Sequence, residues 1–277
     1  MAALALIVAK AGGRALMNNM DRILDSIAWA VREGHRVVFV HGGGDIVTEY
    51  SRRLGVEPRF VVSPQGVRSR YTTWEELEVF VMTLGGLLNK RIVSGLARRG
   101  LHPVGLTGAD GPSVLASRRK RIVVVDESTG RKRVIPGGYT GRITSVNTGF
   151  LNMLLRGGYT PVLAPIAYDP EEGVPLNVDG DQLASRVAAA LGADVLAVLT
   201  DVDGLFLDGV LVERLGVDEA MRLVEEGRIG KGMNRKIIEL SRAVEEGVSR
   251  AVIVNAAREN PLEAALRGEG TVIAKQG

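Results

Sequence analysis

The stretch LALIVAKAGGRALMNNMDRILDSIAWAVREGHRVVFVHGGG, residues 4–44, decides the fold class. The apolar runs Leu4–Ala9 and Arg36–Val40 predict two β-strands. Between them, apolar residues from Met20 to Val31 recur at the i, i+3, i+4, i+7 spacing of an amphipathic helix, which Gly34 ends. A strand, a helix and a second strand in this order are typical of an α/β protein.

The same alternation continues along the chain. Helices are predicted at 45–54, 73–99, 148–156, 181–191, 218–226 and 233–246, and strands at 103–106, 160–164, 194–199, 250–254 and 271–274. From 113 to 146, short strand candidates separated by Gly, Pro and charged turns indicate hairpins instead. We therefore predict a three-layer αβα sandwich with a mostly parallel, open central sheet and a β-hairpin insertion. Active-site loops are expected at the carboxyl ends of its strands.

Composition excludes several classes of site. The chain has 277 residues, 45% of them hydrophobic, with no cysteine and three histidines. Disulfides, thiolate metal sites and cysteine nucleophiles are excluded, and a histidine-rich zinc site is hard to build. No apolar run approaches the ~20 residues that span a bilayer, so we expect a cytoplasmic protein without membrane contact.

The net charge of +3 is too small for a typical nucleic-acid-binding protein. Basic residues nevertheless cluster at 118–121 and 131–133. These clusters are either solvated strands of the predicted hairpins or a landing site for an acidic partner.

Two glycine clusters each lie between a predicted strand and a predicted helix. They are Lys10-Ala11-Gly12-Gly13 and His41-Gly42-Gly43-Gly44. Glycines let backbone N–H groups approach an anion closely, and the following helix N-terminus favours negative charge. The chain contains neither a G-x-G-x-x-G after a strand nor a G-x-x-x-x-G-K-S/T motif. A phosphate site of another design is therefore predicted.

Three further segments carry candidate chemistry. Asn177-Val178-Asp179-Gly180-Asp181 precedes an alanine-rich helix, so Asp179 or Asp181 is either an N-cap or a group that orients lysines or a ligand. Asp201 and Asp203 are either metal ligands or parts of an Asp-Gly turn. The segment 63–71 is predicted to be a loop, in which Arg70 either clamps a substrate carboxylate or is an ordinary surface arginine.

Lysine is scarce in this chain, with seven residues. Outside the basic clusters, Lys10, Lys231 and Lys236 stand in glycine-rich loops or at helix starts. Phosphoryl transfer requires charge neutralisation more than a protein nucleophile, and lysines, backbone amides and Mg²⁺ supply it.

The two glycine clusters, the Asn177–Asp181 segment and Gly232-Met233-Asn234-Arg235-Lys236, in this order, resemble the amino acid kinase superfamily, and within it the N-acetylglutamate kinase branch. The resemblance implies an enzyme that makes acyl phosphates, with ATP as the phosphoryl donor and Mg²⁺ as a cofactor. It also implies an amino-acid lobe at 1–172, with the hairpin insertion at about 113–146, and an ATP lobe at 173–277. The two lobes would share one continuous sheet.

The resemblance also implies roles for individual residues. Lys10 and Lys236 would stabilise the transferring phosphoryl group, and Asp181 would organise them. Phosphate-binding residues would be Gly12, Gly13 and Gly43. Substrate-binding residues would be Gly43, Gly44, Arg70 and Asn177. The nucleotide-binding residues would be Asp201, Gly204, Phe206, Ile229, Gly230 and Lys231. No side chain is assigned to a metal.

The segments 68–72 and 139–143 look like an archaeal and Thermus-type branch of this family. That branch phosphorylates the side-chain carboxylate of 2-aminoadipate or glutamate carried on the C-terminus of the acidic carrier protein LysW, in lysine and arginine biosynthesis. A homodimer formed through the helix near Glu76–Arg91 is also implied.

Two alternatives stay open. One is a kinase of free N-acetylglutamate, and the other is a non-catalytic sensor of amino acids or nucleotides. Lys10, Asp181 and Lys236 speak against the sensor, because binding alone would not require all three. The sequence does not separate aminoadipate from glutamate, which differ by one methylene, worth about 1–3 kcal/mol in a pocket.

Overall fold

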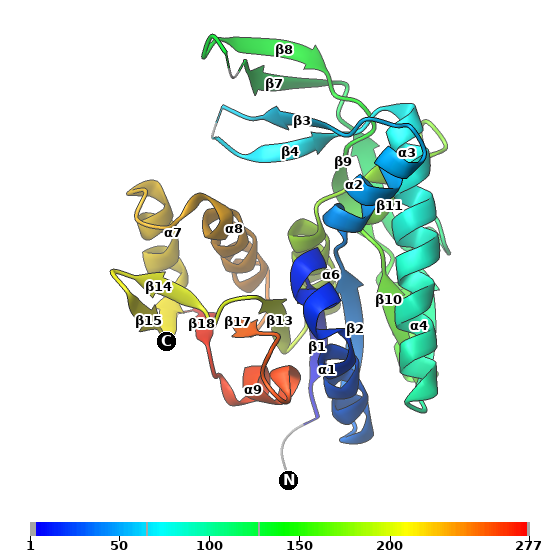
Figure 1. Cartoon of the computed structure of the whole chain (residues 1–277). Coiled ribbons are helices and arrows are strands. Elements are labelled where there is room, and N and C mark those ends of the chain that lie inside the picture. The colour runs from blue at the N-terminus through cyan, green and yellow to red at the C-terminus, as the bar shows by residue number, and fades with distance from the viewer. Residues whose placement is uncertain (1–3, 65, 127, 276–277) are drawn as a thin grey trace.

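The computed structural model describes residues 4–64, 66–126 and 128–275, with the backbone but not the side chain of residue 231. Its central sheet has eight strands in the order β16-β18-β17-β13-β1-β2-β10-β5 (Figure 1). Their bounds are β1 Leu6–Ala11, β2 Arg36–His41, β5 His102–Leu106, β10 Tyr159–Leu163, β13 Val195–Thr200, β16 Arg214–Gly216, β17 Arg250–Asn255 and β18 Thr271–Ala274. Neighbours in the sheet are parallel except β17 and β18.

Helices cover both faces of this sheet because its strands are apolar on both sides. In β1, Leu6 and Val8 join one buried cluster, whereas Ile7 and Ala9 join the other. The first cluster packs against α5 Thr148–Arg156, α6 Gly180–Leu191, α7 Val217–Glu225 and α8 Lys231–Glu245. The second packs against α1 Gly13–Arg32, α2 Gly44–Arg53, α3 Trp74–Phe80, η1 Val81–Leu88, α4 Asn89–Arg98 and α9 Pro261–Arg267. The predicted three-layer α/β sandwich is confirmed.

One long helix runs along the second face. It consists of α3, the wider π-type turns of η1, and α4, and it confirms the helix predicted at 73–99. By length and composition alone, residues 74–98 could cross a membrane. Core helices of soluble proteins pass the same criterion, and 44% of this apolar window is buried inside the fold. This helix is therefore weak support for a membrane span.

The predicted hairpins at 113–146 are also confirmed, and they belong to two small sheets. One sheet has the order β12-β11-β6-β9, with β6 Val114–Arg118, β9 Gly141–Val146, β11 Ile166–Asp169 and β12 Val174–Asn177. The other has the order β4-β3-β7-β8, with β3 Arg59–Val62, β4 Arg68–Tyr71, β7 Arg121–Val125 and β8 Lys132–Pro136. Figure 1 shows the second sheet projecting from the top of the molecule, on the side where α7 and α8 lie. A short hairpin, β14 Leu205–Leu207 and β15 Val210–Val212, follows β13.

The loop predicted at 63–71 is wrong, because its second half, Arg68–Tyr71, is strand β4. The strands β3 and β4 are only partly buried, so they lack the clear alternation of apolar and polar residues that marks a half-buried strand. Their sheet is completed by β7, which follows about fifty residues later and pairs with β3 at Val62 and Val125. Local sequence carries no signal for such a distant partner.

Candidate functional site

The two glycine turns lie side by side at the carboxyl edge of the sheet, because β1 and β2 are parallel neighbours. Their backbones are so close that a Cβ on Gly13 would be 3.0 Å from Cα of Gly43. A Cβ on Gly43 would be 2.5 Å from Cδ2 of Leu84, in the long helix. Gly44, in contrast, has open space around it. Gly13 and Gly43 therefore allow a close approach of backbone to backbone, and of the second turn to η1.

Lys10, Asp181 and Lys236 form one cluster beside these turns. Lys10 follows Leu6 and Val8 at a spacing of two residues, so its side chain faces α6 and α8. Its Nζ lies 2.7 Å from Oδ1 of Asp181, in the first turn of α6. Nζ of Lys236, in α8, donates to Oδ2 of the same carboxylate over 2.9 Å. One carboxylate thus binds two ammonium groups from different elements.

The carboxylate of Asp181 is ionised in this cluster. Burial disfavours its charged form, but the ammonium groups of Lys10 and Lys236 outweigh burial and hold the pKa of Asp181 below its usual range. Because one negative charge meets two positive charges, the cluster retains a net positive charge. Such a cluster attracts a phosphate or another anion.

The segment that precedes α6 has two functions in the structure. Asp179 is the N-cap, since its side chain accepts a hydrogen bond from the N–H of Gln182. Its other carboxylate oxygen, Oδ2, lies 3.1 Å from Nη2 of Arg235, in α8. Asn177, at the end of β12, donates to Oγ1 of Thr72 over 2.9 Å. Asp181 is consequently released from capping and available to the two lysines.

The guanidinium of Arg70, in β4, is held by contacts with three residues. It pairs with the buried Glu76 of α3, and its Nη2 donates to the carbonyl of Gly44 over 3.0 Å and to Thr48 over 2.5 Å. Burial raises the pKa of Glu76, although the Arg70 guanidinium opposes that shift. The structure therefore ties Arg70 to the start of α2, next to the second glycine turn.

One cleft of about 950 Å³ brings seven of the predicted site residues together. Among the residues that line it are Lys10, Gly12, Gly13, Gly43, Gly44, Arg70 and Asn177. Asp181 and Lys236 are not among the lining residues, but Asp181 contacts Lys10, which is one of them, and Lys236 donates to Asp181. The cleft is also lined by basic residues that were not assigned to the site from sequence, namely Arg68, Arg119, Arg121, Lys132 and Arg235.

Arg235 pairs with Asp179, and several residues of the two basic runs are paired as well. Arg118, Lys120 and Arg133 pair with the acidic residues Glu172, Glu171 and Asp126. Arg119, Arg121 and Lys132 make no ion pair with any acidic side chain that the structure describes. These three residues line the cleft, so the two basic runs leave positive charge there without an acidic partner. We call Arg119, Arg121 and Lys132 the basic mouth of the cleft. The runs gave the signal, but which of their residues have acidic partners became visible only in the structure.

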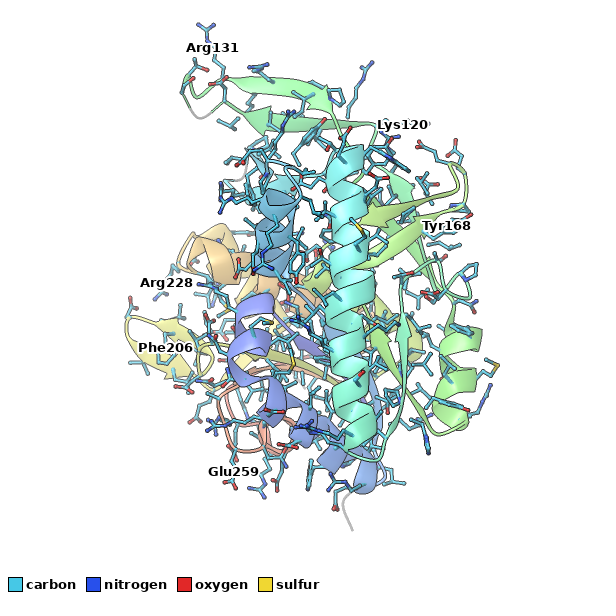
Figure 2. The ribbon with its side chains drawn as sticks, turned by 45° about the vertical axis from the view of Figure 1, so that its right-hand side comes forward. Lys120, Arg131, Tyr168, Phe206, Arg228 and Glu259 are labelled. Carbon is cyan, nitrogen blue, oxygen red and sulfur yellow. The ribbon has the colours of Figure 1, made fainter. Side chains whose placement is uncertain are left out.

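The residues predicted to bind nucleotide lie in other elements. Asp201 and Gly204 are in the turn after β13, Ile229 is buried before α8, and Gly230 is the N-cap of α8. Phe206, in β14, is 48% exposed and lies at the outer edge of the molecule, away from the hairpin that carries Lys120 and Arg131 (Figure 2). Lys231 is the first residue of α8, and its side chain lies outside the described part of the structure. These residues are not among those that line the cleft.

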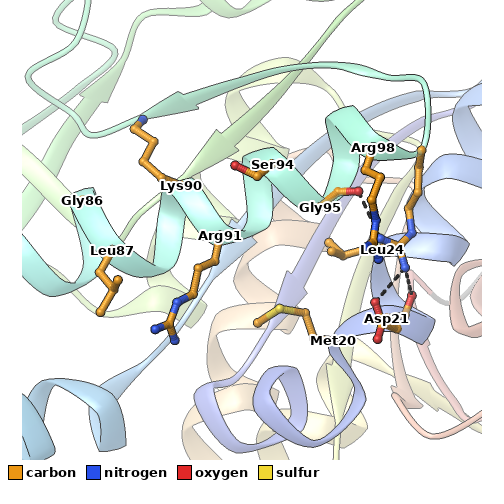
Figure 3. A pocket seen from close by; sticks show the side chains of 11 residues that line it. Met20, Asp21, Leu24, Gly86, Leu87, Lys90, Arg91, Ser94, Gly95 and Arg98 are labelled. Atoms are coloured by element: carbon orange, nitrogen blue, oxygen red, sulfur yellow. Dashed lines mark hydrogen bonds and ion pairs between the residues drawn. The ribbon is translucent and has the colours of Figure 1, made fainter.

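A second cavity of about 750 Å³ lies between α1 and α4 (Figure 3). Met20, Leu24 and Leu87 give it an apolar floor, and Lys90 and Arg91 stand at its side. Asp21 is the one acidic residue among its described lining residues, and it pairs with Arg99 over 2.9 Å. This groove has neither the glycine turns nor the lysine–aspartate cluster of the first cleft.

The cluster predicts a large effect of Asp181 on stability. In Asp181→Asn, Lys10 and Lys236 would lose their counter-charge, and we expect the free energy of unfolding at pH 7 to fall by about 3–5 kcal/mol. Because the pKa of Asp181 is lowered on folding, its contribution is present above the unfolded pKa of about 3.9 and is lost as pH falls further. Denaturant unfolding at several pH values measures both effects.

The matched control is Asp208→Asn, because Asp208 pairs with Arg228 over 3.0 Å in an exposed position. We expect a change near zero for this variant. Equal losses of unfolding free energy in the two variants would contradict the stated role of the buried cluster.

Comparison with known proteins agrees with this geometry. The model of the amino acid kinase family matches residues 5–255. A protein from Sulfurisphaera tokodaii, named LysW-aminoadipate/LysW-glutamate kinase, is 48% identical over 97% of this chain and 100% of its own length. A protein of the same name from Sulfolobus acidocaldarius is also 48% identical, with the same coverage.

Solved structures show the same fold. N-acetylglutamate synthase from Neisseria gonorrhoeae, complexed with coenzyme A and N-acetyl-glutamate, has a TM-score of 0.80 and 27% identity over 99% of this chain and 60% of that chain. Carbamate kinase from Giardia lamblia bound to AMP-PNP has a TM-score of 0.69 at 18% identity, over 100% of both chains, and supports the fold alone. With a family model that spans most of its length and relatives that match it almost end to end, this chain belongs to the amino acid kinase family.

Proposed function

We propose that this protein transfers the γ-phosphoryl group of ATP to the side-chain carboxylate of a carrier-linked 2-aminoadipate, glutamate or both, and so makes an acyl phosphate in lysine and arginine biosynthesis. The observation that carries the proposal is the Lys10–Asp181–Lys236 cluster next to two glycine turns. Lys10 of this cluster lines a cleft that unpaired basic residues also line. The names of relatives at 48% identity support the same acceptor.

The chemistry follows from the charges in the cleft. The acceptor carboxylate is ionised at pH 7, so it attacks the γ-phosphorus in line without a general base. Lys10 and Lys236 neutralise charge on the phosphoryl group as it is transferred, and Asp181 holds both ammonium groups in place. The N–H groups of Gly12, Gly13 and Gly43 would donate to phosphate oxygens. These residues therefore supply positioning and charge, which is most of what phosphoryl transfer requires.

Magnesium would enter this site bound to the nucleotide. The described residues contain no group of three or more His, Asp or Glu side chains that could hold a metal. Asp181 is already bound to two ammonium groups. Mg²⁺ would therefore be held mainly by ATP phosphate oxygens, where it neutralises their charge.

The remaining assignments follow the two halves of the sheet. We assign acceptor binding to residues 1–172, with Gly43, Gly44 and Arg70 on the acceptor's polar groups. Asn177, from the beginning of the other half, would bind the acceptor as well. Nucleotide binding belongs to residues 173–277, with Asp201, Gly204, Phe206, Ile229, Gly230 and Lys231 around the nucleotide. The central sheet includes strands from both halves, and β1 pairs with β13 across the division. Transfer would occur where these two strands meet, close to Lys10.

The basic mouth fits an acidic protein partner, and we propose the carrier LysW for this role. Arg119, Arg121 and Lys132 lie beside the cleft that would receive the carrier's C-terminal amino acid. Complementary charge of this kind speeds association and orients the partner, and a small free acceptor would not need it.

A homodimer and a cytoplasmic location complete the proposal. In the helix near Glu76–Arg91, the side chain of Met82 is 55% exposed. The same helix borders the apolar groove of Figure 3. An exposed apolar face of this kind is typical of a protein contact. We propose a cytoplasmic location because ATP and the biosynthetic acceptors are available there.

The acceptor is tested by measuring ATP turnover with carrier-linked aminoadipate, carrier-linked glutamate and free N-acetylglutamate, each at low and high salt. We expect turnover with the carrier-linked acceptors, with a KM that rises at least about fivefold at high salt because salt screens the basic mouth. Efficient, salt-insensitive use of N-acetylglutamate would instead indicate a kinase of the free amino acid. Binding without turnover of any acceptor would indicate a sensor.

The docking surface is tested separately by Arg121→Glu, which should raise the KM for the carrier-linked acceptor and leave kcat nearly unchanged. Arg267→Glu reverses one charge on α9, at the opposite end of the molecule from β7 in Figure 1, and serves as the control. A similar KM for both variants would contradict docking at the cleft mouth.

The role of Lys236 is tested by Lys236→Ala. Removing one positive charge from the transferring phosphoryl group should lower kcat roughly 10²-fold or more. Single-turnover kinetics with saturating ATP measure this loss directly. Unchanged ATP consumption would show that the assigned mechanism is wrong.

A further inference from the structure

His41, the last residue of β2, is fully buried next to the second glycine turn, and the proposed chemistry gives it no task. Its Nδ1 lies 3.1 Å from the carbonyl oxygen of Gly42. Its Nε2 lies 3.2 Å from Nδ2 of Asn89, which is also fully buried at the start of α4. The imidazole therefore connects the glycine turn to the long helix.

The chemistry of its partners fixes the orientation of the Asn89 amide. Nδ2 of Asn89 lies 3.0 Å from the carbonyl oxygen of Val162, which can only accept. Oδ1 of Asn89 lies 3.2 Å from Nζ of Lys90, which can only donate. The group that faces Nε2 of His41 is consequently the NH₂ of the amide. Nε2 must then accept, so the imidazole proton is on Nδ1 and is donated to Gly42.

The surroundings keep His41 in this neutral form. Burial lowers the pKa of His41 to about 4, and the hydrogen bond to Gly42 opposes this shift only in part. Gly105 leaves room for the side chain of Asn89, because a Cβ at position 105 would be 2.0 Å from Oδ1 of Asn89. At neutral pH the imidazole therefore acts as a fixed donor and not as an acid or base.

The Gly42 carbonyl and the Gly43 N–H belong to the same peptide bond. A trans peptide is planar, and its C=O and N–H point in opposite directions. No cis peptide is present in the described residues. When His41 holds the carbonyl on its own side, the N–H of Gly43 is directed away from His41, in a turn that lines the cleft. That N–H donates to no group in the described part of the chain.

We infer that His41 and Asn89 are positioning residues, which lock the Gly42–Gly43 peptide so that the N–H of Gly43 is aimed at the phosphoryl group being transferred. This inference rests on the proposed function for the identity of the anion. It assigns a task to the histidine that precedes the three glycines. That task is to fix the direction of one backbone donor.

Two substitutions of His41 separate this role from simple packing. An asparagine places its NH₂ near the position of Nδ1 and keeps a donor for Gly42, whereas a glutamine places its amide near Nε2 and loses that donor. His41→Gln should lower kcat at least about tenfold, with a smaller change in the acceptor KM, because a donor to the transition state is misdirected. His41→Asn should keep kcat within about threefold of the parent protein.

His35→Gln is the matched control, since His35 is also buried and stands just before the same strand. Its Nδ1 accepts a hydrogen bond from the N–H of Ala5 over 3.0 Å, far along β2 from the glycine turn. We expect His35→Gln to lower the melting temperature and leave kcat unchanged. Equal kcat values for His41→Gln and His41→Asn, or a loss of stability without a loss of kcat in His41→Gln, would overturn the inference.

A binding measurement keeps the inference separate from the proposed acceptor. Calorimetry with AMP-PNP and with ADP gives the preference for a nucleotide that carries a γ-phosphate. His41→Gln should reduce this preference and His41→Asn should preserve it, even if no tested acceptor supports turnover. An unchanged preference in His41→Gln would overturn the inference. Absence of turnover by the parent protein would count against the proposed function alone.

The tautomer can be observed directly. The chain has three histidines, so ¹⁵N-histidine NMR spectra would be simple to assign. We expect a neutral His41 with its proton on Nδ1 at pH 7, and a mixture of tautomers in Asn89→Leu. A proton on Nε2 in the parent protein would overturn the inference.

Discussion

The contact on which the site depends is one carboxylate held between two ammonium groups. Asp181 comes from the start of α6, Lys10 from the central strand, and Lys236 from α8. Withdrawing charged groups from water is costly unless they are paired, so these three elements meet at one place. The cluster fixes where the helices of the C-terminal half lie against β1. It also leaves one excess positive charge beside the glycine turns, where a phosphate can be accommodated.

The parallel sheet explains why these groups are close together although they are far apart in sequence. The two glycine turns follow neighbouring strands, and both precede helices whose N-terminal N–H groups point to the same edge. Close packing of Gly13 on Gly43 leaves no room for side chains. The hairpin sheet then adds Arg121 and Lys132 to the cleft, and the turn before β7 adds Arg119, so a compact anion site lies next to a broader basic surface.

Much of this arrangement was predictable from sequence, because it depends on local signals. Apolar strands, the 3.6-residue period of the helices and the two glycine clusters mark the central sheet and its active edge. The pairing of Arg70 with Glu76 was missed although the two residues are six positions apart, because the segment 63–71 was predicted to be a loop and no strand was expected to place Arg70 against α3. The link from His41 to Asn89 was not predictable, because these residues are 48 positions apart and meet only when α4 packs against the sheet. The roles of the nucleotide-binding residues stay predictions, because no contact in the cleft defines them.

The central claim is that the Lys10–Asp181–Lys236 cluster and the glycine turns receive the transferring phosphoryl group. A crystal structure of the protein with AMP-PNP and Mg²⁺ tests it most directly. The account predicts the γ-phosphate within hydrogen-bond distance of the N–H of Gly43 and of the ammonium groups of Lys10 and Lys236. A nucleotide bound with its phosphates elsewhere, for example in the groove between α1 and α4 beside Lys90, would contradict it.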